Sequence, residues 1–230
     1  MTSPSPPTHD DAGINLADPH DKRGLKTDYI SILQSMALER YVRPRPGRAV
    51  DLGCGYGRMT RRLCNLGHDA LGIDPSHRVL THASRTFPDI EFCAGALPKL
   101  PLSKESVDTI FLLSVIRVLH LMKIKEVCSD VARPLKPGGR LVIIDNVRLD
   151  DDRYIDESWH EVFFNTKGLK LKARVSIRAS RWPVIYMIRY GLVPRRLFER
   201  IAAWELDRMA GKHRPPRWGY HNVLWVFEKK

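Results

Sequence analysis

The stretch that most restricts how this chain can fold is residues 49–59, which read AVDLGCGYGRM. A short apolar run ends in Asp51, and glycines follow at three alternate positions, Gly53, Gly55 and Gly57. Glycine adopts backbone angles that other residues avoid, and it lets a ligand approach the main chain. The pattern therefore predicts a strand, a tight glycine-rich turn and a helix, which is the first unit of a doubly wound sheet.

The rest of the chain alternates between short apolar runs and segments with helical spacing. We expect strands at 48–52, 69–73, 90–93, 107–113, 140–145, 169–177 and 222–228, and helices at 29–40, after Gly57, from Pro75 and at 124–132. A mostly helical insertion is expected at 183–211, before the last strand. Such alternation predicts an α/β fold with a doubly wound, mostly parallel seven-stranded sheet and helices on both faces.

The length of 230 residues suits one domain with its own core. Residues 1–22 are rich in Pro, Ser and Asp and are expected to form a disordered tail. Residues 23–230 are expected to form a single domain, within which 48–148 is the ligand-binding core. In the same scheme, 149–221 is a substrate and lid region with a basic helical insertion, and 222–230 is the last strand.

Composition points to a protein of a reducing compartment. The four cysteines form no C-x-x-C pair, which predicts free thiols and neither a disulfide framework nor a metal site. The first residues lack the apolar core of a signal peptide, and no run reaches the roughly 20 apolar residues of a membrane span. We therefore expect a cytoplasmic protein.

The net charge of +12 is concentrated in the last third of the chain. Residues 1–165 carry 22 Lys and Arg against 22 Asp and Glu, whereas residues 166–230 carry 16 against 4. This asymmetry indicates an anionic partner, such as a phosphorylated acceptor, an anionic membrane surface or nucleic acid. The plainer alternative is a solvated basic face without a specific partner.

The glycine spacing narrows the choice of ligand. Dinucleotide-binding turns require glycine at position 58, where this chain has Arg58, so its G-x-G-x-G pattern favours a smaller ligand with a carboxylate. Asp74 ends the next predicted strand and can accept hydrogen bonds from both ribose hydroxyls of a nucleoside. The alternatives are a purely structural turn for the glycines and a helix cap for Asp74.

With these residues in place, the chain resembles the class I S-adenosylmethionine-dependent methyltransferases, which have a Rossmann-like fold. The resemblance rests on VDLGCGYG, on GIDPS and on VARPLKPGGRLVIID, and it covers roughly residues 37–145. It implies S-adenosyl-L-methionine as the cofactor and methyl transfer as the activity. It also implies the cofactor-binding residues, which are Asp51, Gly53, Cys54, Gly55, Gly57, Asp74, Pro75, Ser76, Ala96, Leu97 and Ser114.

One position departs from the family. Members commonly carry G-D-A before L-P after the third strand, whereas this chain reads AGALPKLP. On this reading Gly95 replaces an aspartate that would bind the adenine amino group, at a cost of about 1 kcal/mol.

Candidate groups for the acceptor side follow the later strands. His120 and His160 are candidate general bases, needed only where the acceptor begins protonated, and a structural role is the alternative for each. Asp145 and Asn146 end the fifth strand and are expected to contact substrate. Tyr29 is placed to fold over the cofactor and acceptor.

Some acceptors are disfavoured. The [D/N/S]-P-P-[Y/F/W] pattern of amino-methylating enzymes is replaced by LLSVIRVLH, and no cysteine follows a proline as cytosine C5 methylation requires. The favoured hypothesis is methyl transfer to a small molecule or a saccharide or lipid intermediate, most plausibly at oxygen. The insertion, with arginines beside aromatic and aliphatic residues, suggests an anionic acceptor or peripheral contact with an anionic inner membrane face. The alternatives are an RNA methyltransferase that uses the basic third and a non-catalytic cofactor-binding protein.

Overall fold

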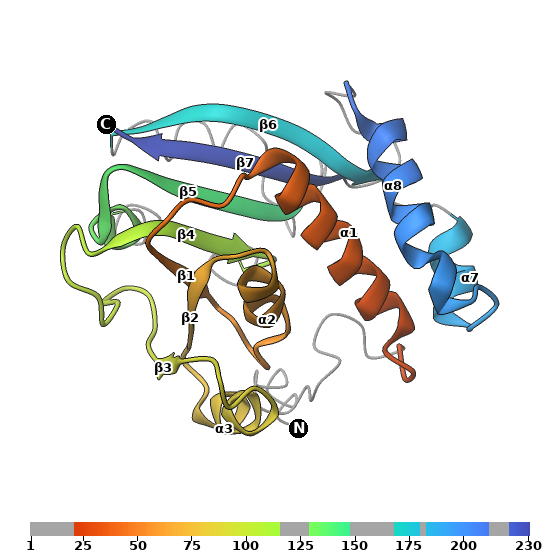
Figure 1. Cartoon of the computed structure of the whole chain (residues 1–230), viewed down its shortest axis with the longest axis horizontal. Helices are drawn as coiled ribbons and strands as arrows, with labels where there is room; N and C mark the ends of the chain where they lie inside the picture. Colours follow the sequence, from red (N-terminus) through yellow and green to blue (C-terminus); the bar gives the residue numbers. More distant parts are fainter. Residues whose placement is uncertain (1–20, 116–128, 148–167, 180–182, 212–220) are drawn as a thin grey trace, which may run out of the picture.

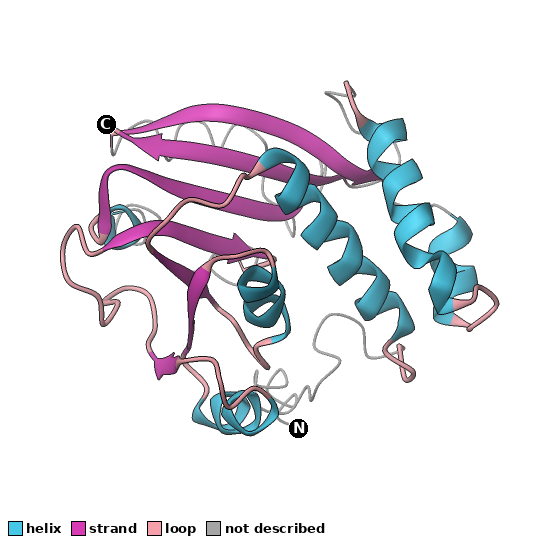
Figure 2. Ribbon diagram, in the orientation of Figure 1, coloured by secondary structure: helices cyan, strands magenta, loops and turns pink. Residues whose placement is uncertain are grey.

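The computed structural model describes residues 21–115, 129–147, 168–179, 183–211 and 221–230, and it contains one seven-stranded sheet (Figures 1 and 2). The strand order is β3-β2-β1-β4-β5-β7-β6. The strands are β1 (Arg48–Leu52), β2 (Asp69–Asp74), β3 (Phe92–Ala94), β4 (Val107–Leu113), β5 (Leu135–Val147), β6 (Leu169–Ala179) and β7 (His221–Lys229). The helices are α1 (Leu25–Tyr41), α2 (Arg58–Asn65), α3 (His77–Thr86), α7 (Pro183–Arg189) and α8 (Phe198–Met209), with a 3₁₀ turn η1 (Arg195–Leu197).

The sheet is mostly parallel, as the sequence predicts. Strands β1 to β5 run in one direction, and β7 pairs antiparallel with both β5 and β6. Because β7 alone is reversed, β6 ends and β7 begins at the same edge where β1 to β5 end. Register confirms this, since His221 lies opposite both Val147 and Ala179.

The core has two parts, one on each face of the sheet. On one face, helices α1, α2, α7 and α8 pack on strand residues such as Phe111, Ile144 and Leu224 (Figure 1). On the other face, Val131 and Ala132 from a helical segment pack on residues such as Ile110 and Trp225. The predicted helix at 124–132 lies only partly within the described residues.

Helix α1 begins earlier than the predicted 29–40, and Asp21 explains why. The buried Asp21 carboxylate accepts hydrogen bonds from the backbone N–H groups of Lys26 and Thr27, at 3.3 and 2.8 Å. These donors have no partner inside a helix, so a carboxylate there stabilises the first turn. The predicted tail of 1–22 is thus too long by at least two residues, because Asp21 is part of the folded domain.

Three other boundaries also differ from the prediction. Helix α3 begins at His77 because Ser76 caps it, with its hydroxyl accepting from the Val79 N–H at 3.5 Å. Strand β3 occupies 92–94 rather than 90–93. Strand β5 begins at Leu135 rather than at 140, because Leu135 already pairs with Val107 of β4. The register between the two strands then shifts, and regular pairing resumes where Thr109 lies opposite Arg140. Residues 135–139, which precede the predicted strand, are therefore part of β5.

Candidate functional site

The predicted ligand-binding residues gather at the edge where the parallel strands end. The glycine turn follows β1, Asp74 ends β2, and Ser114 follows β4. Asp145 and Asn146 lie near the end of β5, and the Ser114 N–H donates to the Ile144 carbonyl at 2.7 Å. Ligands bind to open α/β sheets at this edge, so the topology brings segments far apart in sequence to one place.

The glycine turn is fixed to the neighbouring strand by its backbone. The N–H groups of Gly53 and Cys54 both donate to the carbonyl oxygen of Ile73 in β2, at 2.7 and 3.0 Å. Gly53, Gly55 and Gly57 have φ angles of 79°, 53° and 74°. Side-chain-bearing residues rarely adopt such angles, so the alternate glycines are a requirement of this turn.

The three glycines differ in what surrounds them. A Cβ atom on Gly53 would lie 2.6 Å from Val115 Cγ2, and one on Gly57 would lie 2.6 Å from Phe92 Cζ. A Cβ atom on Gly55 would meet nothing within 4 Å. Gly53 and Gly57 are therefore needed for packing, whereas Gly55 leaves open space against its backbone, where a ligand can approach.

Asp74 joins this turn to the next one. Its side chain is 1% exposed, and its two carboxylate oxygens accept from the N–H groups of Gly55 and Ser76, each at 2.9 Å. A carboxylate can accept about four hydrogen bonds. Asp74 therefore retains acceptor capacity directly beside the open space at Gly55, while both of its oxygens are held in place.

Asp51 and Cys54 are buried side chains at the glycine turn. The buried Asp51 carboxylate accepts from the Thr60 hydroxyl of α2 at 2.6 Å, which ties β1 to that helix. Burial raises the pKa of Asp51 to about 6, although the Thr60 hydrogen bond opposes the shift. Burial also raises the pKa of the Cys54 thiol, so this side chain stays protonated and unreactive.

The comparisons with known proteins agree with this geometry. Residues 49–139 match a family described as a methyltransferase domain. An uncharacterised methyltransferase of Mycobacterium tuberculosis is 34% identical over 101 residues, covering 44% of this chain and 40% of that protein. An O-methyltransferase of Pyrenophora dematioidea is 32% identical over 144 residues, covering 56% of this chain and 52% of that protein. The chain thus spans about half the length of the curated relatives it matches.

A solved structure extends the likeness to most of the chain. The geranyl diphosphate C-methyltransferase of Streptomyces coelicolor A3(2), solved with S-adenosyl-L-homocysteine, superposes with a TM-score of 0.63. The match covers 90% of this chain and 84% of that one, at 15% identity, so it speaks for the fold alone. Residues 49–139 belong to the class I S-adenosylmethionine-dependent methyltransferases.

The residues of this methyltransferase domain fit the family's cofactor. Gly55 presents bare backbone to open space, and the oriented Asp74 carboxylate beside it has acceptor capacity for ribose hydroxyls. Of four predicted cofactor-binding residues, Pro75 and Ala96 are exposed, whereas Ser76 and Leu97 are buried. Ser76 has a second role, since it caps α3.

Gly95 has a packing role in this domain. A Cβ atom there would lie 2.6 Å from Pro101 Cδ and 2.9 Å from Ile73 Cγ2. The space that a carboxylate would need at this position is therefore already occupied by apolar atoms. Gly95 fills a tight position in the fold rather than leaving a gap in the adenine site.

Two side chains at the site were not identified from sequence. Gln34 of α1, which is 3% exposed, places its Nε2 3.5 Å from the Ser114 hydroxyl. Asn222 of β7, equally buried, donates from Nδ2 to Asn146 Oδ1 at 3.2 Å. The sequence signal that could have identified both is a polar residue at a position where the spacing of the surrounding apolar residues predicts an apolar one.

Some predicted residues lie elsewhere. Tyr29 of α1 is fully buried, and its hydroxyl donates a hydrogen bond to Glu205 Oε2 of α8 at 2.7 Å. The structure therefore gives this hydroxyl a partner within the fold, where we had expected it to contact the methyl acceptor. His120 and His160 lie outside the described residues. Within the described ranges there is no group of three or more His, Cys, Asp or Glu that could hold a metal ion.

Proposed function

We propose that the protein is a methyltransferase that uses S-adenosyl-L-methionine to methylate a small-molecule, saccharide or lipid-type acceptor at oxygen. The observation that carries the proposal is the pairing of Gly55, which has a positive φ and open space where a Cβ atom would lie, with the buried and oriented Asp74 carboxylate. When bound, the cofactor supplies a methyl group activated by a sulfonium. The chain then has to hold that group, orient the acceptor and exclude water.

The acceptor side of the proposal rests on polar groups at the ends of β5 and β7. Asp145 accepts from the Asn146 N–H at 2.7 Å, and Asn146 is linked to Asn222. The side-chain amide oxygen of Asn222, Oδ1, is buried and has no hydrogen-bond partner among the described residues. A buried acceptor without a partner is costly, so a hydroxyl group donated by a bound acceptor molecule would stabilise this edge.

Two relatives bear on the atom that is methylated. The O-methyltransferase of Pyrenophora dematioidea supports oxygen. The geranyl diphosphate enzyme methylates carbon, but at 15% identity its likeness is one of fold and does not determine the acceptor. We favour oxygen because the polar edge at Asn146 and Asn222 is suited to holding a hydroxyl group. His120 and His160 remain the proposed general bases for that hydroxyl.

The test is transfer of labelled methyl from S-adenosylmethionine into a cell extract separated into lipid, polysaccharide, nucleic-acid and small-molecule fractions. The matched control is Asp74→Ala, which removes the carboxylate beside the open space at Gly55. Label that enters the lipid, polysaccharide or small-molecule fraction with the wild-type chain and disappears with the control supports the proposal. Label in nucleic acid would favour the RNA methyltransferase, and cofactor binding without label in any fraction would favour the non-catalytic protein.

The proposed bases are tested once the acceptor is known. We expect His120→Ala or His160→Ala to lower kcat by about 10²- to 10⁴-fold if that residue removes the acceptor's proton. The loss should shrink as the pH rises, because a more ionised acceptor needs less help. Unchanged turnover in both variants would remove general-base catalysis by these histidines from the mechanism.

A further inference from the structure

The large apolar side chains that are exposed among the described residues all lie in the insertion between β6 and β7. They are Tyr186 at 50%, Met187 at 43%, Tyr190 at 65%, Leu192 at 68% and Trp204 at 52% exposure. Single exposed apolar residues are ordinary, but a group of them in one segment indicates an interaction surface.

Four of these residues belong to one short stretch, α7 and the turn that follows it. We call Tyr186, Met187, Tyr190 and Leu192 the α7 tip. The opposite side of α7 is used for packing, since Ile185 and Ile188 are buried in the core shared with α1. The helix therefore has two apolar sides, and only one of them has a partner within the described fold.

Basic residues surround the α7 tip. Arg23, before α1, places its Nη1 3.5 Å from the Tyr190 carbonyl oxygen and lies against Gly191. The Arg189 guanidinium lies 5.6 Å from the centre of the Tyr190 ring. Arg195 and Arg196 follow in the next turn, and both are exposed. Arg195 pairs with the partly exposed Asp28, and Glu199 is the nearest exposed acid in sequence, so the basic residues named here still outnumber the acidic ones.

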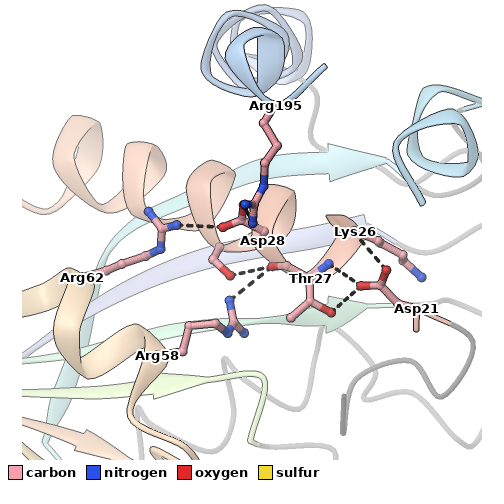
Figure 3. Close-up of polar contacts among 8 residues, drawn as sticks. Asp21, Lys26, Thr27, Asp28, Arg58, Arg62 and Arg195 are labelled. Atoms are coloured by element: carbon pink, nitrogen blue, oxygen red, sulfur yellow. Dashed lines mark hydrogen bonds and ion pairs between the residues drawn. The ribbon is translucent and has the colours of Figure 1, made fainter. Parts of the chain in front are cut away.

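The α7 tip is connected to the cofactor-binding half of the molecule. Figure 3 shows Asp28 of α1 between two arginines, with Arg195 Nη2 at 2.8 Å and Arg62 Nη2 of α2 at 3.3 Å. In the same view, Arg58 Nη1, at the start of α2, donates to the Thr27 carbonyl at 3.3 Å. The start of α1 thus links the turn after α7 to the helix that begins at the glycine turn.

We propose that the α7 tip and its basic surroundings form a docking surface for an anionic lipid membrane. Tyrosine, leucine and methionine side chains enter the boundary between headgroups and acyl chains, and arginines at the margin bind lipid phosphates. Among the described residues no helix is long and apolar enough to cross a membrane, so the contact is made at its surface. The proposal concerns a surface outside the methyl-transfer site and does not depend on the acceptor.

Charge complementarity selects this occupant over two others. A second copy of the chain would bring a further set of arginines against Arg23 and Arg196, and like charges at such an interface repel. Single-stranded nucleic acid also binds basic surfaces, but it uses aromatic rings as stacking platforms. The exposed Leu192 and Met187 of the α7 tip have no aromatic ring and fit acyl chains better than bases.

The experiment is co-sedimentation of the full chain with vesicles of phosphatidylcholine alone and of phosphatidylcholine mixed with phosphatidylglycerol. Three variants are compared with the wild type: Tyr190→Ser with Leu192→Ser, Arg196→Glu, and Arg85→Glu. Arg85 is exposed on α3 in the other half of the chain and serves as the matched charge control (Figure 1). Binding of S-adenosylhomocysteine, measured by calorimetry on the same preparations, verifies that each variant is folded.

We expect the wild type to bind the anionic vesicles, to remain unbound with phosphatidylcholine, and to dissociate as salt rises. The double serine variant should lose more than about tenfold in partitioning. Arg196→Glu should lose at least about fivefold, since each basic residue near such a surface contributes on that order. Arg85→Glu should stay within about twofold of wild type, because its charge lies away from the α7 tip.

Three outcomes would overturn the proposal. The first is wild-type partitioning that is equal for the two kinds of vesicle or undetectable with both. The second is an equal loss in Arg85→Glu and Arg196→Glu, which would indicate non-specific attraction of a basic protein. The third is a dimer in the absence of lipid that the double serine variant converts to a monomer, which would assign the α7 tip to a second copy. Retained cofactor binding in each case would leave the proposed methyltransferase function unaffected.

Discussion

The two halves of the sheet carry different kinds of candidate binding group. From β1 to β4 the candidate groups are backbone N–H groups, glycines and the single carboxylate of Asp74, and they lie within residues 1–165, which together carry no net charge. From β6 to β7 they are exposed aromatic and basic side chains on an insertion that lies beyond the matched residues 49–139. Backbone recognition demands particular residues at fixed spacing, whereas side-chain recognition on a helical insertion leaves the spacing free.

The largest effect that would test this contrast is loss of cofactor binding in Asp74→Ala. Two hydrogen bonds from ribose to a carboxylate are worth about 1.5–3 kcal/mol each, so we expect affinity for S-adenosylhomocysteine to fall by more than about 100-fold. Calorimetry measures this, with Asp89→Ala as a control that removes an exposed carboxylate paired with Arg61 on the same half. If Asp74→Ala retained affinity within about tenfold of wild type, the ribose would have to be bound by other groups.

A second test separates glycines that pack from the glycine that faces a ligand. Gly95→Ala should lower the free energy of unfolding by about 2 kcal/mol, because its Cβ would overlap Pro101 and Ile73. Gly55→Ala should cost about 1 kcal/mol for its positive φ and in addition weaken cofactor binding. Urea unfolding and calorimetry on both variants check the pair. If the two variants lost cofactor affinity in the same proportion to their loss of stability, Gly55 would not differ from Gly95 in facing the ligand.

The boundary between α1 and the insertion contains a group that should make stability depend on pH. Glu205 of α8 is 3% exposed, and burial raises its pKa from 4.5 to about 7, although Tyr29 and the charges of Arg178 and Arg208 oppose the shift. The folded state holds this proton more tightly than the unfolded chain does. Its stabilising contribution is complete below about pH 4.5 and is lost as the pH rises through about 7.

Glu205→Gln tests this directly, because it keeps an acceptor for the Tyr29 hydroxyl and removes the charge. The variant should gain about 1–2 kcal/mol relative to wild type between about pH 5 and pH 8. Urea unfolding of the variant and the wild type at both pH values measures the change. Asp51 also titrates in this range, but it is present in both proteins, so its contribution cancels in the difference between them. A difference between variant and wild type that is the same at both pH values would be inconsistent with a buried, ionising Glu205.

The smallest effect concerns the link between the two halves. Asp28 is partly exposed, so its ion pairs with Arg62 and Arg195 are screened by water. We expect Asp28→Asn to lower the free energy of unfolding by about 0.5–1 kcal/mol and to leave cofactor affinity nearly unchanged. Thermal unfolding at low and high salt measures the loss, which should shrink as salt rises. A salt-independent loss would mean that Asp28 acts through packing.

The sequence predicted the parts of the structure that local rules govern. The strands at 48–52 and 107–113 were placed correctly because they are apolar runs bounded by turn residues. The glycine turn and the position of Asp74 near the end of the second strand were predicted from the sequence pattern, and the structure has both. The start of α1 was missed because Asp21 caps it from outside the helix, a contact that local propensity does not reveal.

The remaining differences at the site depend on contacts between distant segments. The residues next to Gly95 in sequence do not indicate that Pro101 and Ile73 occupy the space where a Cβ atom at this position would lie. Asn222 and Asn146 meet only because β7 inserts next to β5, and 76 residues separate them in sequence. Tyr29 was expected at the acceptor, yet its partner Glu205 is 176 residues away and could be identified only from the packing of α1 on α8.

The reversed direction of β7 has a consequence for how such a molecule can change. Because β6 ends at Ala179 and β7 begins at His221, facing each other across one register, the chain between them leaves and rejoins the sheet at a single point. The insertion is joined to the sheet by these two strands, and its buried side chains, among them Ile188 and Phe198, pack in the core with α1. The exposed side of the insertion could be exchanged while this packing, the sheet and the glycine turn keep their form, so new acceptors or surfaces can be acquired without rebuilding the cofactor half.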